Sequence, residues 1–150
     1  NKIIINKITH THKITDTLMV PTVKFSEQAL IDILDRINVV YPYIILAQAK
    51  LESANYSSKL FRTNNNLFGM RHARKRLTAS EMDKGGYAYY RDWIDCVYDR
   101  GMWDASNMCD ISSEDEYFAR LSLRYAEDPN YIPKLKTIIQ KEHLRELFAD

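Results

Sequence analysis

Glu52 occupies the position in this sequence that is most suggestive of chemistry. It follows the apolar residues Leu46, Ala47, Ala49 and Leu51, at the end of a stretch with helical character. A carboxyl group that is partly buried at such a position has a raised pKa, because desolvation disfavours its charged form. A carboxyl group that keeps its proton in a cleft can act as the general acid that cleaves a glycosidic bond. The alternative interpretation is a solvated glutamate at a helix end.

Two further features fit a carbohydrate site. Gln48 lies one helical turn before Glu52 on the same face, so it is predicted to orient Glu52 or to bind sugar. The chain also contains 10 Tyr, whose flat apolar rings with polar tips suit carbohydrate surfaces. The competing interpretation is that most of these tyrosines pack at the edge of the core.

Other chemical patterns are weaker. Residues 71–76 form a basic run that could contact nucleic acid phosphates, although a net charge of +1 argues against a nucleic-acid-binding surface. His10 and His12 stand without a cluster of other ligands, and Cys96 and Cys109 lack the spacing of a zinc site. No glycine-rich phosphate loop is present. We therefore expect no metal, no cofactor and no nucleic acid partner.

The elements that must position Glu52 are mainly helical. Phe25, Ser26 and Leu30 form the pattern of a capped helix start with a hydrophobic staple. Pro42 suits the first turn of a second helix, which runs to Glu52 and is apolar enough to be the buried central helix. A polar loop is expected after it.

The second half of the chain adds one small β element to further helices. Gly85 and Gly86 precede an alternating stretch, residues 87–91, which predicts a β-hairpin lobe. Asp92 is a predicted N-cap, residues 113–116 form a capping box, and a last helix is expected to extend to Leu147. Cys96 is predicted to be buried, and a bridge between Cys96 and Cys109 stays open.

Length and composition fit one folded unit. The 150 residues support a single core, and we assign residues 1–24 to an N-terminal arm and residues 25–150 to one domain. No apolar run is long enough to span a membrane. The sequence begins at Asn1, which indicates a fragment, a mature form or an excised domain, and leaves room for a larger chain or a virion or envelope assembly.

Four segments resemble a known family in their order and spacing. They are LAQAKLES at 46–53, NNLFG at 65–69, YAYYRDW at 87–93 and YAEDPNY at 125–131. Together they resemble the family 73 glucosaminidases, which include the muralytic domain of the flagellar rod protein, bacterial autolysins and phage lysins. Because four motifs agree over residues 25–140, chance similarity is improbable.

The resemblance implies a fold and an activity. The fold would be mainly α, a lysozyme-like helical domain with a small β-hairpin lobe beside the catalytic cleft. The activity would be hydrolysis of the β-1,4 bond after N-acetylglucosamine, with the glycan strand of peptidoglycan as partner. That substrate places the protein outside the cytoplasm, whether secreted, periplasmic, on the cell surface or in a virion.

The resemblance also implies roles for individual residues. Glu52 would be the general acid, and Tyr125 would contact the reacting sugar in the cleft. Substrate-binding residues would form the floor and the glycan groove: Gln48, Asn66, Phe68, Gly69, Tyr87, Tyr89, Tyr90, Trp93 and Tyr131. The basic run at 71–76 would then meet carboxylates of stem peptides or other cell-wall anions, unless it is a solvated loop.

The sequence departs from the family pattern at two positions and in one segment. Ala54 stands where glycine is usual, and Glu127 replaces the threonine of the late motif. The β-lobe, residues 70–87, is short, and this is where some members carry a second catalytic carboxylate. Glu81 and Asp83 are the candidates here, although both are also readily interpreted as solvated loop charges.

Two mechanisms follow from this difference. An inverting hydrolase needs a base carboxylate at roughly 6.5–9.5 Å from the acid, which a mobile β-lobe could supply on closure. The other mechanism uses the N-acetyl oxygen of the substrate as nucleophile, with Tyr125 positioning the acetamido group. We favour substrate assistance, because Tyr125 belongs to a matching motif and neither Glu81 nor Asp83 does.

Two alternative functions remain open at the level of the sequence. The chain could be a catalytically silent glycan-binding or structural module of a virion or cell-surface assembly. The retention of Glu52 argues against this, because a silent module does not need the acid. The third possibility is a helical nucleic-acid-binding protein, whose DNA affinity would depend on salt.

Overall fold

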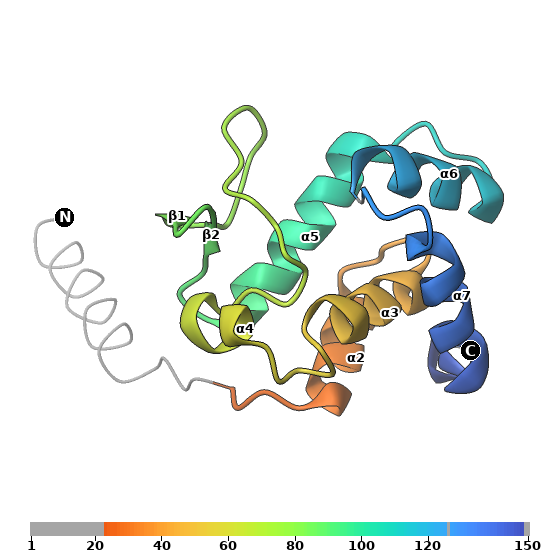
Figure 1. The fold of residues 1–150 in the computed structure, drawn as a ribbon, viewed down its shortest axis with the longest axis horizontal. Helices are drawn as coiled ribbons and strands as arrows, with labels where there is room; N and C mark the ends of the chain where they lie inside the picture. The colour runs from red at the N-terminus through yellow and green to blue at the C-terminus, as the bar shows by residue number, and fades with distance from the viewer. Residues whose placement is uncertain (1–22, 126, 149–150) are drawn as a thin grey trace, which may run out of the picture.

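The computed structural model describes residues 23–125 and 127–148, in which a group of helices carries one short hairpin at its edge (Figure 1). In chain order the elements are α2 (Glu27–Arg36), α3 (Pro42–Glu52), α4 (Lys59–Asn64), β1 (Met82–Lys84), β2 (Tyr87–Tyr89), α5 (Trp93–Asn107), α6 (Glu114–Arg124), α7 (Tyr131–Lys141) and the 3-10 helix η1 (Leu144–Phe148). All but two residues of the predicted N-terminal arm, 1–24, lie outside the described ranges.

Helix α3 forms the centre of the core, as its apolar sequence predicts. Pro42 occupies its first turn, and every residue from Ile44 to Lys50 is buried. It packs against α2, α7 and η1. The one charged side chain in this stretch, Lys50, lies 2.5 Å from Glu27 and 2.8 Å from Glu142, so its charge is compensated where the helix is covered.

The predicted helix starts are confirmed by their caps. Ser26 accepts a hydrogen bond from the Ala29 amide at 3.0 Å, and Asp92 accepts one from the Asp95 amide at 2.9 Å. Ser113 accepts one from the Glu116 amide at 3.2 Å. Each cap satisfies an amide that has no partner inside its helix, which fixes where the helix begins.

The loop expected after α3 contains the short helix α4. Ser58 caps it by accepting a hydrogen bond from the Phe61 amide at 3.1 Å, and Asn65 ends it with a φ of +52°. The Ser58 cap and the asparagines at 64–66 are the signals for this helix, but the polar composition favoured a loop.

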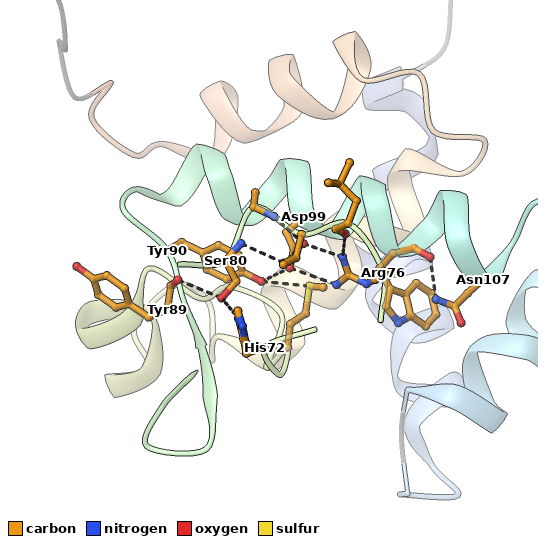
Figure 2. A network of polar contacts seen from close by, with 12 residues as sticks. His72, Arg76, Ser80, Tyr89, Tyr90, Asp99 and Asn107 are labelled. Atoms are coloured by element: carbon orange, nitrogen blue, oxygen red, sulfur yellow. Dashed lines mark hydrogen bonds and ion pairs between the residues drawn. The ribbon is translucent and has the colours of Figure 1, made fainter. Parts of the chain in front are cut away.

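The β-hairpin lobe is confirmed and is small. Strands β1 and β2 pair antiparallel, with Asp83 opposite Ala88. Asp99 on α5 fixes the lobe: it accepts hydrogen bonds from Arg76 at 2.8 Å, Thr78 at 2.7 Å and Tyr90 at 2.5 Å (Figure 2). Burial raises the pKa of Asp99, but these hydrogen bonds outweigh burial and hold the pKa below its usual value.

The last predicted helix is wrong in its length. Helix α7 ends at Lys141, and His143 has a φ of +52°, which an α-helix cannot accommodate. The chain then forms the separate 3-10 helix η1, so the apolar spacing up to Leu147 spans two elements. Leu144 is buried at the start of η1.

The arrangement confirms the mainly α, lysozyme-like fold. Figure 1 shows α5 crossing the middle of the domain, with α4 and the hairpin on one side and α6 and α7 on the other. Cys96 on α5 is buried, as predicted, whereas Cys109 is exposed and both are free thiols. Within the described ranges, no helix combines the length and apolar character that a membrane span needs.

Candidate active site

Glu52 is the last residue of α3 and is followed by an unusual turn. Ala54, Asn55 and Tyr56 have φ values of +49°, +57° and +70°. The buried Ser53 stabilises this turn, because its hydroxyl donates to the Ala49 carbonyl and accepts from the Tyr56 amide at 2.8 Å. Ala54 lies in the left-handed region that favours glycine, which explains in physical terms why glycine is usual at this position in the family pattern.

The Glu52 carboxyl group has the environment of an acid. Burial raises its pKa, and a hydrogen bond from the Tyr131 hydroxyl opposes this effect only in part. The same hydroxyl accepts a hydrogen bond from the Gln48 amide at 2.9 Å. Tyr131 therefore lies between Gln48 and Glu52 and directs its proton toward the carboxyl group.

Gly69 forms the wall beside the Glu52 carboxyl group. A Cβ atom at this position would lie 3.2 Å from Glu52 Oε2, and the φ of +65° is also one that favours glycine. The buried Asn66 holds the loop in this shape: its Oδ1 accepts from the Phe68 and Met70 amides at 3.2 and 3.1 Å. Asn66 and Phe68 are both buried, and Asn66 fixes the loop that places Gly69 against Glu52.

A buried arginine, Arg100, holds the side chain of Gln48 in place next to Tyr131. The guanidinium group of Arg100 donates to Gln48 Oε1 at 2.7 Å, to Asp104 Oδ1 at 2.9 Å and to the Tyr117 hydroxyl at 2.9 Å. Arg100 and Gln48 are both 0 % exposed. Gln48 was predicted to orient Glu52 or to bind sugar, and in the structure it contacts Tyr131, which in turn donates to Glu52.

Tyr125 lies beside Glu52 at the end of α6. Its ring stacks on that of Tyr131, with centroids 6.3 Å apart, and its hydroxyl donates to the Phe68 carbonyl. Burial raises the pKa of the Tyr125 hydroxyl, so it keeps its proton at neutral pH. Tyr125 and Glu52 come from the two ends of the resembling region, and the fold brings them together.

Of the four aromatic residues of segment 87–93 that were predicted to line the groove, two belong to the core instead. Tyr90 is 0 % exposed and donates its hydroxyl proton to Asp99, and the Trp93 ring is buried with its Nε1 donating to the Val23 carbonyl. Tyr90 was misplaced because the alternation of residues 87–91 does not indicate which face is covered, and Trp93 because it begins α5 and is not part of the strand. Tyr87 and Tyr89 are partly exposed on the hairpin, where Arg71 and Lys84 contact their rings.

The candidate second carboxylates are solvated. Glu81 is exposed, and its amide pairs with the Tyr89 carbonyl at 2.9 Å. Asp83 is also exposed and accepts from the Gly86 amide at 2.9 Å, which stabilises the hairpin turn. Among the described residues, no carboxylate is a cause of the raised pKa of Glu52. No group of three or more metal-ligating side chains occurs in the same ranges.

Several residues of the site are not apparent from the sequence pattern. Arg100 and Asp104 form an i, i+4 pair on α5, which is usually a surface feature, yet both are buried here. Trp103 on the same helix packs edge-on against Tyr125 with ring centroids 5.3 Å apart. An arginine among the apolar residues of a helix was the one available signal.

Comparisons with known proteins agree with this architecture. The sequence profile of the glucosaminidase family, described as mannosyl-glycoprotein endo-β-N-acetylglucosaminidase, matches residues 28–144. The catalytic domain of the autolysin Auto from Listeria monocytogenes is similar in structure, with a TM-score of 0.56 and 24 % sequence identity over 91 % of this chain and 96 % of that chain. An N-acetylmuramoyl-L-alanine amidase from Staphylococcus aureus is similar too, with a TM-score of 0.65 and 24 % identity over 85 % of this chain and 45 % of that chain. No curated protein sequence gives a significant match.

Proposed function

The chain belongs to the glucosaminidase family of cell-wall glycoside hydrolases, and we propose that Glu52 is its general acid for cleaving the β-1,4 bond after N-acetylglucosamine in peptidoglycan. The observation that carries this proposal is the Glu52 carboxyl group, which lies against Gly69 with a pKa raised by burial. Such a group holds a proton where the leaving oxygen of a sugar needs one. Because peptidoglycan lies outside the cytoplasm, the protein would act there.

The products of wall digestion test the proposed bond. Purified peptidoglycan is incubated with the protein, reduced with borohydride and analysed by mass spectrometry. We expect fragments whose reduced ends are N-acetylglucosamine. Reduced N-acetylmuramic acid ends would instead identify a muramidase on the same fold. Binding of the glycan without any product would contradict the hydrolase and support the silent glycan-binding module.

We further propose that the reaction is substrate-assisted. Glu81 and Asp83 are exposed on the hairpin, and Asp83 is occupied by the turn, so neither is prepared to act as a base. In the proposed step the acetamido oxygen of the reacting sugar attacks its own anomeric carbon while the glycosidic bond breaks. The departing oxygen takes the proton of Glu52. Water then opens the cyclic oxazolinium intermediate, and Glu52 regains a proton from that water.

Tyr125 has the geometry to position the acetamido group. Its O–H donates to the Phe68 carbonyl, which leaves the hydroxyl oxygen as an acceptor. An acetamido N–H that donates to this oxygen would be held with its carbonyl oxygen directed toward the anomeric carbon. Tyr125 would thus fix the nucleophile in an attacking orientation while Glu52 supplies the proton.

The substitution Tyr125→Phe tests this role. We expect kcat to fall about 10²-fold, because a poorly oriented nucleophile loses this much. The stability of the fold should fall by only about 1 kcal/mol, the net value of one hydrogen bond. Steady-state hydrolysis of soluble glycan fragments and urea denaturation measure the two effects. Tyr98→Phe, an exposed tyrosine on α5, is the matched control, and an unchanged kcat in Tyr125→Phe would exclude Tyr125 from the mechanism.

A further inference from the structure

A basic cavity of about 320 Å³ opens beside the candidate active site. Its walls come from residues 69–73 of the loop before the hairpin, from α5 and from the end of α6. The side chains that give it its character are Arg71, His72, Arg76, Trp103, Arg124 and Tyr125, and no carboxylate lines it. Its volume lies at the lower end of the range for ligand sites, which suits one substituent of a polymer.

Two of the three arginines form no ion pair within the described residues. Arg76 is paired with Asp99 at 2.8 Å and is held against α5, as Figure 2 shows. Arg71 donates to the Gly86 carbonyl at 3.0 Å and Arg124 to the Asn107 side-chain oxygen at 3.3 Å, both neutral acceptors. In the ranges 23–125 and 127–148, neither Arg71 nor Arg124 has a carboxylate within ion-pair distance. Two cations that line one cavity without a counter-ion favour an anionic ligand.

The His72 side chain is fixed at the same wall. Its Nδ1 lies 2.9 Å from Ser80 Oγ, and the Ser80 hydroxyl is within hydrogen-bond distance of the Tyr89 carbonyl at 3.2 Å (Figure 2). Trp103 provides a flat apolar surface on the opposite element. The cavity therefore combines an aromatic wall, which suits a sugar ring, with cations, which suit a carboxylate.

The cavity lies next to Glu52, and Gly69 and Tyr125 belong to the surroundings of both. Gly69 lines the cavity and is also the residue whose Cβ would touch Glu52. Tyr125 lines it as well and stacks on Tyr131, which hydrogen-bonds to Glu52. A sugar unit adjacent to the one that reacts at Glu52 would therefore lie at the cavity.

We propose that this cavity binds a carboxylate carried by the muramic acid residue next to the bond that is cleaved. The inference rests on the proposed function. In a strand of alternating units, both neighbours of a reacting N-acetylglucosamine are muramic acids, and these carry the acidic substituents. The carboxylate belongs either to the lactyl group of a peptide-free muramic acid or to the attached stem peptide, and Arg71 and Arg124 bind it.

The test compares peptidoglycan before and after its carboxylates are neutralised. Peptidoglycan is first freed of phosphate-containing polymers. One part is amidated with carbodiimide and ammonia, and the native and amidated parts are digested by the wild type, Arg71→Gln and Arg124→Gln. We expect amidation to raise the apparent KM of the wild type about tenfold with little change in kcat, since a hydrogen bond to a charged group is lost. Each arginine variant should show the raised KM on native peptidoglycan and little further loss on the amidated form.

The controls separate this inference from the function on which it rests. Arg74→Gln and Lys75→Gln remove exposed charges of the same basic run that do not line the cavity, and should behave like the wild type. Because Arg71 also contacts the hairpin, Arg124→Gln alone is sufficient to decide. Equal digestion of native and amidated peptidoglycan by all variants would overturn the inference and leave the hydrolase intact. If the wild type cleaves neither form, the proposed function itself fails.

Glycan strands stripped of peptides identify the source of the carboxylate. If Arg124→Gln weakens cleavage of stripped strands more than that of native ones, the lactyl carboxylate is the ligand, because the stem peptide blocks this group as an amide in native strands. If the variant matches the wild type on stripped strands only, the stem peptide is the ligand. If the arginine variants still have a higher KM than the wild type on amidated peptidoglycan, the arginines do not bind a carboxylate, and the proposal is overturned.

Discussion

Replacing Glu52 by glutamine is expected to lower the rate of peptidoglycan hydrolysis by about 10²–10⁴-fold, the usual contribution of a general acid. The amide has nearly the shape of the carboxyl group, so the contact with Gly69 and the hydrogen bond with Tyr131 can be kept in the variant. It cannot deliver the proton that the leaving sugar oxygen requires. The release of reducing ends from purified walls measures the effect.

The stability of Glu52→Gln provides an internal control with a defined sign. Burial raises the folded-state pKa of Glu52 above its ordinary value of 4.5. The folded state therefore favours the protonated form, and the stability linked to this group is present below the unfolded pKa and is lost as the pH rises through the folded pKa. The glutamine variant does not titrate, so urea denaturation should show it gaining on the wild type as the pH rises from below 4.5 to neutrality.

Two outcomes would contradict this assignment. Normal wall lysis by Glu52→Gln would mean that another group donates the proton. A pH-independent stability difference would mean that Glu52 is not buried as described. The variants Glu81→Gln and Asp83→Asn address the mechanism separately: activity should persist in both, whereas its loss in either would indicate an inverting reaction with the hairpin supplying the base.

Replacing Arg100 by methionine is expected to destabilise the fold by about 3–5 kcal/mol, the cost of removing one partner of a buried ion pair. Asp104, which is 7 % exposed, would lose its counter-ion, Gln48 would lose two hydrogen bonds and Tyr117 one. Methionine preserves most of the side-chain volume, so a packing defect contributes little. Urea denaturation at neutral pH measures the free energy of unfolding.

A second arginine of the same domain is the matched control for Arg100. Arg120 pairs with Asp110 at 3.0 Å, but Asp110 is exposed and Arg120 only half-buried, so water screens the pair. Arg120→Met should therefore cost at most about 1 kcal/mol. Equal losses in the free energy of unfolding in the two variants would show that the buried Arg100–Asp104 pair stabilises the fold no more than the Arg120–Asp110 pair does.

The sequence was most informative where one local rule determined the structure. The caps at Ser26, Asp92 and Ser113 and the apolar run of α3 each predicted an element that the structure contains. Glu52 was found because a single carboxylate ended an apolar helix. The resemblance then added the distant Tyr125, which no local pattern connects with Glu52.

The sequence was least informative where the tertiary structure decided which side of a residue is covered. Tyr90 and Trp93 belong to the same aromatic segment as Tyr87 and Tyr89, but the hydrogen bond of Tyr90 to Asp99 and that of Trp93 to Val23 hold them in the core. Arg100 and Asp104 have the spacing of a surface ion pair and are buried by α3 and α6. Burial of polar groups depends on partners from distant segments, and these partners cannot be identified from local sequence patterns.

The contacts of Glu52 also make the site depend on the C-terminal part of the chain. Glu52 ends α3, whereas Tyr131, whose hydroxyl donates to its carboxyl group, begins α7, which packs against α3. A chain that ends before α7 has the Glu52 carboxyl group but lacks this donor and this neighbouring helix. We therefore expect a domain truncated before Tyr131 to lack a complete site, even though it contains the whole motif around Glu52.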